Sequence, residues 1–340
     1  MLEVLTPGLL STVQDAGRHG YADLGLPRSG ACDPWGLAAA NALLGNELGA
    51  PALEMTVVGP ELRVLATCVV AVAGSDLGAH IPEEHRAVRL GESTLVRAGT
   101  TLAFAPEWTA SHPAAINGAR AYLTMSGGID VPAILGSAAT YLAGGFGGLE
   151  GRALASGDRL RSSRRGDLAA AGRRWPDEVS PPPYASAPVV RIVRARISEG
   201  AEHHWAALLG TEWKVAADSD RMGLRLSGTT PMPPPTATSD RLLSHGVTWG
   251  TVQLPPGGQP IILLADHQTV GGYPVLGVVA AVDRPLLGQL APGGTLHFAE
   301  ITIVDAQTAY REQMAALRRA AAALLRRDPW EQLPDASASW

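Results

Sequence analysis

The sequence has one lysine and two cysteines, and these shortages exclude several kinds of site. Lys214 stands in Glu-Trp-Lys-Val, outside any GxxxxGK[ST] pattern, so the chain has no P-loop for nucleotide phosphates. A biotin carrier needs an exposed lysine for acylation, whereas the apolar neighbours of Lys214 predict a strand, so we expect no biotin on this chain. Cys32 and Cys68 cannot build a disulfide framework and supply no CxxC pair for a metal ion.

Long apolar runs and an excess of positive charge are also missing. The longest apolar stretches, residues 68–74, 261–265 and 275–282, are far too short to cross a bilayer. The N-terminus lacks the basic segment of a secretory signal. With a net charge of -5 and a pI near 6.0, no positive field favours nucleic acid or an anionic membrane. We expect a cytoplasmic protein that binds neither.

The residues that are abundant are typical of a mainly β protein. The chain has 39 glycines and 26 prolines, and its short apolar segments are separated by Gly-rich turns. We predict a first β-rich half at residues 1–165, a charged and Pro-rich linker at 166–188, and a second β-rich half at 189–305. The last strand-like segment covers 295–304, and residues 306–340 are expected to form a C-terminal helix, over 306–327, followed by a tail.

One short helix is predicted inside the first half, over residues 34–46. Asp33 can cap its first turn, and Pro34 suits the first helical position because the missing N–H has no partner there. Gly45 and Asn46 are typical of a helix end.

Two polar, Gly-rich segments of the first half are candidates for a site. In residues 12–21, Gln14, Asp15 and Arg18 stand among glycines that allow close backbone approach to a ligand, although an Asp–Arg pair that stabilises a loop would look the same. Ser29 begins the stretch that leads into the predicted helix, whose first N–H groups attract anions. Asp33 competes for those donors as a cap.

Two further segments lie in the second half. Ser219, Asp220 and Arg221 follow a predicted strand, and the Asp–Arg pair suggests either a bidentate clamp for a carboxylate or carbamate, or a turn with an internal ion pair. Residues 266–273 follow the apolar run 261–265, and a dense polar loop after a buried strand is a common position for a site. We consider this last segment the strongest candidate.

Histidines add one candidate. His267 lies within the last segment and suits a general base near neutral pH. His203 and His204 have no third ligand at metal spacing, so we expect a surface pair and no metal site. The residues alone predict a β-rich protein with a polar site for a small anionic ligand.

The same four segments, in this order, resemble the KipA-like family, which comprises the C subunits of 5-oxoprolinase and is also called allophanate hydrolase subunit 2. The resemblance covers roughly residues 1–305 and rests on long strings that agree in order and spacing. The matching stretches are TVQDAGRHGY (12–21), SGACD (29–33), LEMTVVGPEL (53–62), YLTMSGGIDVPAILGS (122–137), GGFGGLEGRALASGDRL (144–160), DSDRMGLRLSG (218–228), GTVQLPPGGQPIILLADHQTVGGYP (250–274) and QLAPGGTLHF (289–298).

The resemblance implies a fold, an activity and partners. Members resemble the second half of the carboxyltransferase domain of urea carboxylase and have cyclophilin-like β-barrel modules, so two such modules are expected here. They pair with a KipI-like subunit and, with a LamB/YcsF-like subunit, look like the ATP-dependent 5-oxoprolinase that opens 5-oxoproline to glutamate. ATP, with Mg²⁺ and shared with the partner subunits, would phosphorylate the lactam oxygen and supply a leaving group. Biotin, if used, would arrive on another chain.

Together these segments give the candidate site. We expect catalytic roles for one set of residues, namely Asp266, His267, Gln268, Thr269 and Tyr273. We expect a second set to bind substrate or another anion, namely Asp15, Arg18, Ser29, Ser219, Asp220, Arg221, Gln253, Gly271 and Gly272.

Two departures from the family pattern and two alternative functions remain. Ala138 replaces an arginine of the family's Gly-Ser-Arg-Ser-Thr pattern, and the Arg-Gly-Pro after the linker is lost at Arg194. The substrate can therefore differ from 5-oxoproline.

The first alternative function is that of a biotin-dependent carboxyltransferase acting on urea or another amide. The second is a binding protein that sequesters a KipI-like inhibitor of a sensor kinase.

Overall fold

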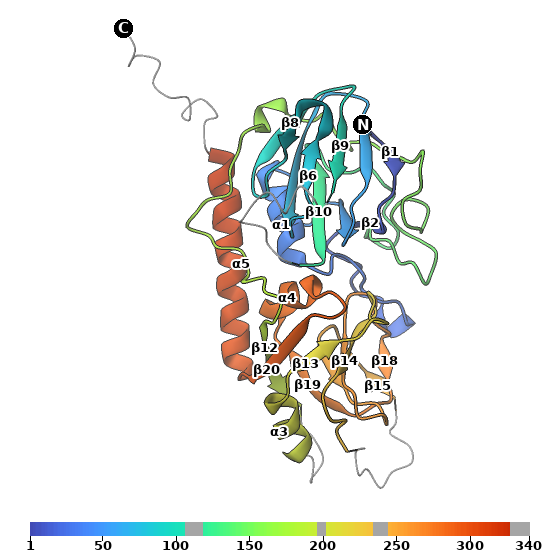
Figure 1. Ribbon diagram of the computed structural model, residues 1–340, viewed down its shortest axis with the longest axis vertical. Helices are drawn as coiled ribbons and strands as arrows, with labels where there is room; N and C mark the ends of the chain where they lie inside the picture. Colours follow the sequence, from blue (N-terminus) through green and yellow to red (C-terminus); the bar gives the residue numbers. More distant parts are fainter. Residues whose placement is uncertain (106–117, 196–201, 234–243, 327–340) are drawn as a thin grey trace.

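A computed structural model describes residues 1–105, 118–195, 202–233 and 244–326. Two β-rich bodies are stacked end to end, and one long helix runs along the side of both (Figure 1). None of the helices in these four ranges has the length and apolar character needed to cross a membrane.

The first body consists of two antiparallel sheets that enclose one apolar core. The first sheet has the order β11 (Arg159–Leu160), β1 (Leu2–Thr6), β4 (Glu61–Val64), β9 (Thr101–Phe104), β6 (Ala79–Ile81) and β7 (Arg86–Ala87). The second has the order β2 (Leu10–Gln14), β3 (Ala52–Thr56), β10 (Arg120–Met125), β5 (Cys68–Gly74) and β8 (Ser93–Val96). Helix α1 (Pro34–Leu43) covers the outer face of β5 and β10, so these strands are buried on both faces and lack a polar alternation.

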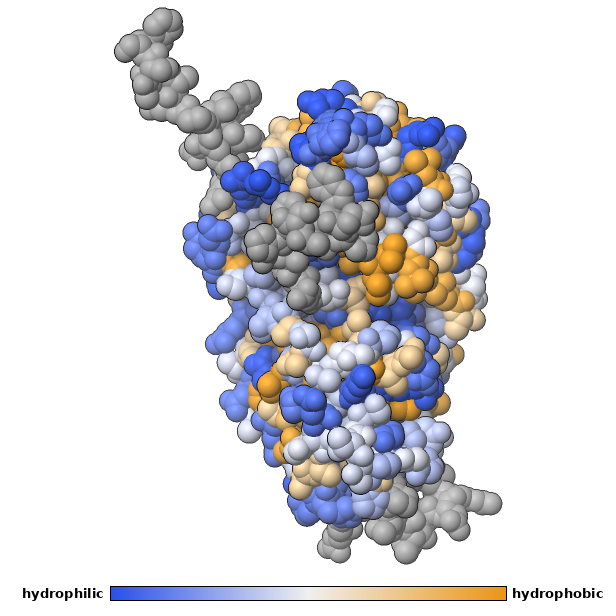
Figure 2. Space-filling view, viewed as in Figure 1, coloured by the Kyte–Doolittle hydropathy of each residue, from blue (hydrophilic) through white to orange (hydrophobic). Residues whose placement is uncertain are grey.

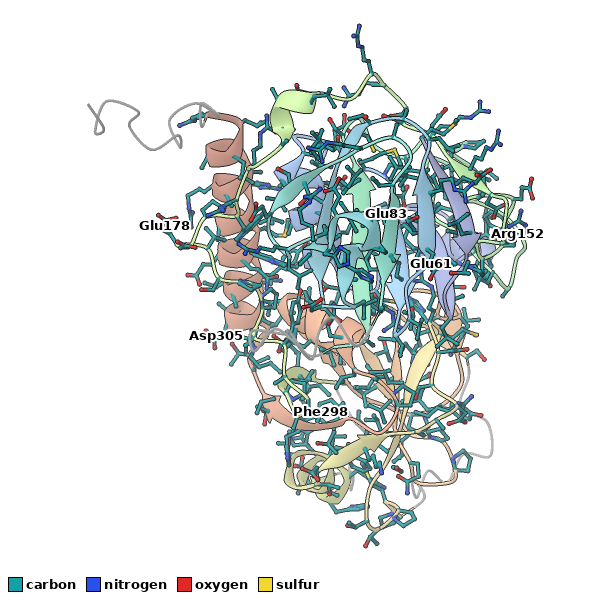
Figure 3. The ribbon with its side chains drawn as sticks, turned by 45° about the horizontal axis from the view of Figure 1, so that its top comes forward. Glu61, Glu83, Arg152, Glu178, Phe298 and Asp305 are labelled. Atoms are coloured by element: carbon teal, nitrogen blue, oxygen red, sulfur yellow. The ribbon has the colours of Figure 1, made fainter. Side chains whose placement is uncertain are left out.

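The second body is a closed barrel of seven strands. Its order is β12 (Val189–Arg194), β19 (Val275–Val279), β16 (Thr251–Gln253), β17 (Ile261–Leu263), β14 (Gly223–Ser227), β13 (Trp213–Val215) and β20 (Thr295–Glu300). Parallel pairing of β12 with β20 closes the barrel, with Val190 opposite Phe298. Phe298 lies inside the barrel, and Asp305 lies where the long helix begins beside it (Figure 3). A separate two-stranded ribbon joins β15 (His245–Gly246) to β18 (Val270–Gly271).

Three further α-helices and four short 3-10 helices complete the described residues. The α-helices are α3 (Glu202–Gly210), α4 (Arg284–Gln289) and α5 (Ile303–Arg326). The 3-10 helices are η1 (Ala22–Leu24), η2 (Pro82–Glu84), η3 (Leu168–Ala170) and η4 (Ala281–Asp283). Helix α5 packs on α1 and η4 and so bridges the two bodies.

The mainly β prediction is confirmed, and the second half closes into a barrel as expected. The strands of the first half, by contrast, pair as two sheets. Helix α1 begins at Pro34, and the Asp33 side chain accepts a hydrogen bond from the N–H of Gly36 at 2.9 Å, as the capping prediction requires. The predicted tail beyond residue 327 lies outside the described residues.

Two local predictions were wrong. The strand predicted over 295–304 ends at Glu300, and α5 begins at Ile303, because Thr302 accepts the N–H of Asp305 and donates to its carboxylate at 2.7 Å. The expected surface pair of histidines is half buried. His204 is 3% exposed and contacts the carbonyl oxygen of Pro233 at 2.8 Å, because α3 packs against β20.

Helix α5 offers a matched pair of leucines for measuring what it contributes to stability. Leu324 is 1% exposed and packs against α1 and β5, whereas its neighbour Leu325 is 62% exposed. We expect Leu324→Ala to lower the free energy of unfolding by about 2–5 kcal/mol because it leaves a cavity, and Leu325→Ala by less than about 1 kcal/mol. Urea denaturation of both variants measures the difference. Equal losses would show that α5 does not dock through this face.

Candidate functional site

The side chain of Arg221 joins the two bodies at their junction. It is 4% exposed and lies just before β14 of the barrel. Its Nε and Nη2 donate to the two carboxylate oxygens of Asp266 at 2.8 and 3.1 Å, within the barrel. Nη1 donates to the Glu54 carboxylate and to Cys32 Sγ, and Nη2 to the Gly30 carbonyl oxygen, all in the first body. One guanidinium thus binds two buried carboxylates from different parts of the chain.

Glu54 is the second centre of this network. Besides Arg221, it accepts hydrogen bonds from the N–H of Cys32 at 2.8 Å and the hydroxyl of Tyr122 at 2.7 Å, and Arg120 lies 3.7 Å away. Burial alone would raise the pKa of Glu54, but the charges of Arg221 and Arg120, together with the hydrogen bonds from Tyr122 and Cys32, hold that pKa below its usual value. Sequence reasoning missed Glu54. Its signal was a lone carboxylate inside the apolar stretch Leu53 to Val58.

Arg221 forms a bidentate pair with a carboxylate, but that carboxylate belongs to Asp266 of the same chain. Asp220 does not take part, because it is exposed and its Oδ1 accepts the N–H groups of Met222 and Gly223 in a turn. Ser219 lies in the same turn and accepts the N–H of Arg225 at 3.0 Å. The structure therefore separates Ser219 and Asp220 from the buried network.

Asp15 and Arg18 both bind the loop at residues 134–148, and they form no ion pair with each other. Asp15 accepts hydrogen bonds from the hydroxyl of Ser137 at 2.7 Å and the N–H of Ala138 at 2.6 Å. Arg18 donates to the carbonyl oxygens of Ile134 and Ala139, both at 3.1 Å, and lies 4.7 Å above the ring of Phe146. Its Nη1 is buried and has no partner among the described residues. Burial lowers the pKa of Arg18, although the charges of Asp15 and Asp266 oppose this.

Ser29 brings the start of the helical segment against the barrel. Its backbone is left-handed, with φ of 53°, and its N–H donates to the carbonyl oxygen of Ala265 at 3.0 Å. The Ser29 hydroxyl is buried without a partner among the described residues. Asp33 occupies the N-terminal donors of α1 and also accepts from Tyr184 and Gln289, each at 2.7 Å. The start of α1 is therefore occupied by the chain's own carboxylate.

The segment 266–273 lies on the barrel side of the junction. His267 and Thr269 are buried, whereas Gln268, Gly272 and Tyr273 are exposed. Burial lowers the pKa of His267, so its imidazole is neutral at pH 7. Gln253 is 1% exposed and accepts a hydrogen bond from Gln268 at 3.4 Å, and its Nε2 has no partner among the described residues.

The lack of a side chain at Gly271 permits close backbone approach to Gln253. A Cβ at this position would lie 2.4 Å from Gln253 Nε2. The structure thus brings Asp15, Arg18, Ser29 and Arg221 together around Asp266, and it places Gln253 beside Gln268 and Gly271. The roles predicted for these residues stay predictions.

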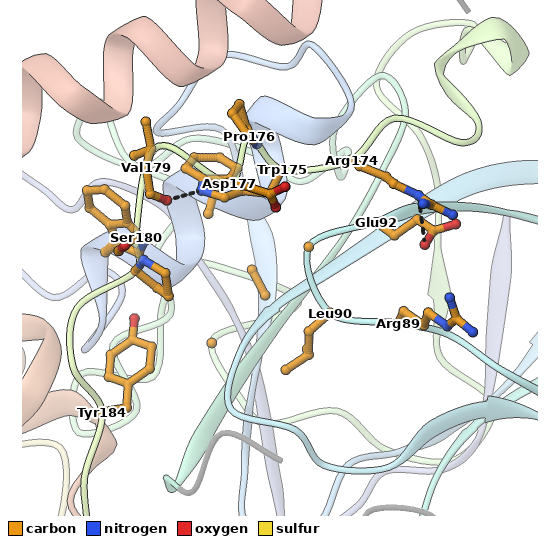
Figure 4. Close-up of a pocket in the computed structure, with 16 residues that line it drawn as sticks. Arg89, Leu90, Glu92, Arg174, Trp175, Pro176, Asp177, Val179, Ser180 and Tyr184 are labelled. Atoms are coloured by element: carbon orange, nitrogen blue, oxygen red, sulfur yellow. Dashed lines mark hydrogen bonds and ion pairs between the residues drawn. The ribbon is translucent and has the colours of Figure 1, made fainter. Parts of the chain in front are cut away.

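Two pockets share Trp35 of α1 in their walls. The larger, about 450 Å³, lies under the segment that follows η3, and its wall includes Trp35, Trp175 and Tyr184 (Figure 4). Figure 4 also shows two contacts of this segment: Trp175 Nε1 donates to the carbonyl oxygen of Val179 at 2.7 Å, and Arg174 pairs with Glu92. The smaller pocket, about 280 Å³, lies between α1 and α5.

Replacing Arg221 tests whether the buried network holds the two bodies together. We expect Arg221→Met to lower the free energy of unfolding by about 3–5 kcal/mol, because Glu54 and Asp266 would stay buried without their cation. The matched control is Arg225→Met, which removes an exposed ion pair with Asp218 and should cost less than about 1 kcal/mol. Chemical denaturation measures both. A loss in Arg221→Met no larger than in the control would contradict the role given to the network.

Asp33 gives the stability of the protein a specific dependence on pH. Burial raises the pKa of Asp33 from 3.8 to about 6, despite hydrogen bonds from Gly36, Tyr184 and Gln289. Because the folded protein then holds this proton more tightly than the unfolded chain, Asp33 destabilises the fold progressively as the pH rises from about 4 to 6. The free energy of unfolding of wild type minus that of Asp33→Asn should fall by roughly 3 kcal/mol across this range. A difference that does not change with pH would contradict the assignment.

Comparisons with known proteins agree with one another. A family model described as the carboxyltransferase domain, subdomain A and B, matches residues 24–300. The C subunit of 5-oxoprolinase from Escherichia coli is 36% identical over 92% of this chain and 95% of its own length, and that of Haemophilus influenzae is 32% identical over 90% and 93%. The crystal structure of the K. lactis urea amidolyase superposes with a TM-score of 0.81 at 27% identity, over 94% of this chain but only 20% of that enzyme. The chain belongs to the carboxyltransferase subdomain A and B family.

Proposed function

We propose that this protein is the C subunit of an ATP-dependent 5-oxoprolinase, which opens 5-oxo-L-proline to L-glutamate in the cytoplasm. It would act with a KipI-like and a LamB/YcsF-like subunit. Similarity to the C subunits of two bacterial 5-oxoprolinases over nearly their whole length supports this role.

Three buried polar groups at the junction support the proposal of a site that is shared with another chain. Arg18 Nη1, the Ser29 hydroxyl and Gln253 Nε2 are buried without partners among the described residues. Ser29 bonds to Ala265 and Gln253 to Gln268, and the charge of Asp266 acts on Arg18, so all three groups are linked to the segment 265–271. A buried polar group without a hydrogen bond costs about 1–3 kcal/mol, so such groups are kept where a ligand or another chain supplies the partner.

The chemistry of the substrate fits these groups. 5-Oxoproline has one carboxylate and one lactam, and Arg18 Nη1 offers a charged donor for the carboxylate. ATP would phosphorylate the lactam oxygen and be released as ADP. A first water would add to the ring carbon, and the C–N bond would break as the nitrogen takes a proton and leaves as an amine, which gives an acyl phosphate. A second water would hydrolyse this acyl phosphate to the carboxylate of glutamate and free phosphate. His267, neutral at pH 7 because burial lowers its pKa, suits the removal of a proton from the first water.

In this proposal, ATP binding requires the partner subunits. Lys214, the single lysine, is exposed on β13 and lies in no phosphate-binding loop. ATP with Mg²⁺ would therefore bind at a site completed by another chain. Exposed apolar side chains suit such contacts, and Val270 and Tyr273 of the candidate segment are 57% and 45% exposed. Figure 2 shows further apolar surface gathered at the right of the view, near the level where the two bodies meet.

The second candidate function is that of a biotin-dependent carboxyltransferase subunit. It is favoured by the structural likeness to the K. lactis urea amidolyase over 94% of the chain. Because this chain offers no suitable lysine for biotin, that activity needs a biotinylated partner. Streptavidin blotting of the purified complex distinguishes the two, since the oxoprolinase reaction predicts no biotinylated chain.

The decisive assay combines this chain with its two proposed partner subunits. We expect glutamate from 5-oxoproline and ATP only when all three are present, and none when this chain is omitted. Substitution of Gln253 then tests the site. Gln253→Leu should change the free energy of unfolding by less than about 1 kcal/mol, because Nε2 has no partner among the described residues and the bond from Gln268 to Oε1 is long, at 3.4 Å. It should nevertheless lower glutamate formation at least about tenfold.

The matched control is Gln307→Leu, at an exposed position on α5 where the glutamine only accepts from Arg311. It should retain full activity. Full activity of Gln253→Leu would remove the junction as the site, while the need for three subunits could still stand. If the three-subunit complex forms but releases no glutamate, the proposed oxoprolinase activity is contradicted. If this chain binds the KipI-like subunit but the complex has no activity, the regulatory alternative is favoured.

A further inference from the structure

The smaller pocket, between the two bodies and α5, is lined by apolar side chains and by arginines. Its volume is about 280 Å³. Apolar side chains of α1 and α5 form much of the lining, including Trp35, Leu37, Met314 and Leu317. The wall from α5 lies beyond residue 300, where the family match ends. Of the residues with predicted site roles, only Asp15 lines this pocket.

Arginines supply the charge of the pocket. Arg28, Arg284 and Arg318 all line it, and none of them forms a salt bridge with a described residue. Asp15 is the one acidic residue among the described residues of the lining, and its carboxylate is already held by Ser137 and the adjacent loop. The pocket therefore has an excess of positive charge.

Two of these arginines, Arg28 and Arg284, make contacts that leave some of their N–H donors available. Arg28 donates its Nε and Nη2 to one carbonyl oxygen, that of Ala16, at 3.2 and 2.8 Å. Arg284 lies 4.9 Å above the ring of Trp249 and donates Nη2 to the Trp249 carbonyl oxygen at 3.3 Å. The Nε of Arg284 and the Nε1 of Trp249 are both buried without a partner among the described residues. Trp249 itself is 3% exposed.

Electrostatics agree with this geometry. Burial, together with the nearby charge of Arg28, lowers the pKa of Arg284 to about 10, whereas Tyr310 acts in the opposite direction. Burial also lowers the pKa of Arg28. Two partly desolvated cations thus lie close together without a salt-bridge partner in the described part of the chain, which destabilises the empty pocket.

We propose that this pocket binds a small organic carboxylate with an apolar body, whose carboxylate bridges Arg28 and Arg284. Guanidinium groups match the two oxygens of a carboxylate, and the hydrocarbon wall of Leu37, Met314 and Leu317 suits an aliphatic or aromatic body. The volume lies just below the range of typical ligand pockets, so the ligand is smaller than a nucleotide. This pocket shares only Asp15 with the residues of the proposed oxoprolinase site, and none of residues 266–273 lines it.

Titration calorimetry on the full chain, without partner subunits, tests the proposal. Benzoate is the probe, benzamide is its uncharged counterpart, and inorganic phosphate is the oxyanion without an apolar body. We expect benzoate to bind, and benzamide and phosphate to bind at least about tenfold more weakly. Arg284→Met and Arg28→Met should each weaken benzoate binding at least about tenfold, while the exposed barrel variant Arg225→Met should not change it.

A second readout separates a ligand site from a structural role. If the arginines await an anion, Arg284→Met should be at least as stable as wild type without ligand, and benzoate should raise the melting temperature of wild type and of Arg225→Met but not that of Arg284→Met. Arg284→Lys, which keeps the charge, should bind more tightly than Arg284→Met. Equal binding of benzamide, tighter binding of phosphate, unchanged affinity in both methionine variants, or no binding of any probe would each overturn the proposal. None of these outcomes depends on glutamate formation.

Discussion

Two carboxylates and one guanidinium, all buried, impose the strongest constraint on this structure. Arg221 reaches from the barrel to Glu54 in the first body while it holds Asp266 beside it. The attraction between buried charges only offsets the cost of taking them out of water when geometry is good and the remaining donors and acceptors are satisfied. Here they are satisfied, by Tyr122 and the N–H of Cys32 at Glu54 and by Gly30 at Arg221. The two bodies can therefore meet in only one register.

That register determines where the candidate site lies. With Asp266 fixed by Arg221, the segment that follows it must leave the barrel at the junction, opposite the loops that carry Arg18 and Ser29. A second polar link lies nearby, where Gln289 bonds to Asp33, to Ser75 and to the backbone of Arg120. These contacts leave few polar atoms of the network without a hydrogen-bond partner, among them Arg120 Nε. Arg18 Nη1, the Ser29 hydroxyl and Gln253 Nε2 are also buried without a partner among the described residues.

Local sequence signals predicted the local parts of this arrangement. Asp33 and Pro34 predicted the start of α1, and the apolar run ending at Ala265 predicted the strand that delivers Asp266. The chemistry of a side chain depends, however, on contacts between distant positions. Arg221 was paired in sequence with its neighbour Asp220, whereas in space it binds Asp266 and Glu54, 45 and 167 residues away. A single sequence contains no signal for such pairs, and the same limit explains why the burial of His204 was missed.

The distribution of unsatisfied groups separates what this chain does alone from what it does with others. A closed barrel and two packed sheets satisfy nearly all their backbone groups internally, so remaining deficits fall on a few side chains. At the junction these are neutral groups and one arginine beside Asp266, an arrangement that suits a polar substrate with both donors and acceptors. Between α1 and α5 they are Arg284 Nε and Trp249 Nε1, which lie with Arg28 beside a hydrocarbon wall, an arrangement that suits an anion with an apolar body. Because the two sets of groups differ in charge and in lining, we propose that they serve two different ligands.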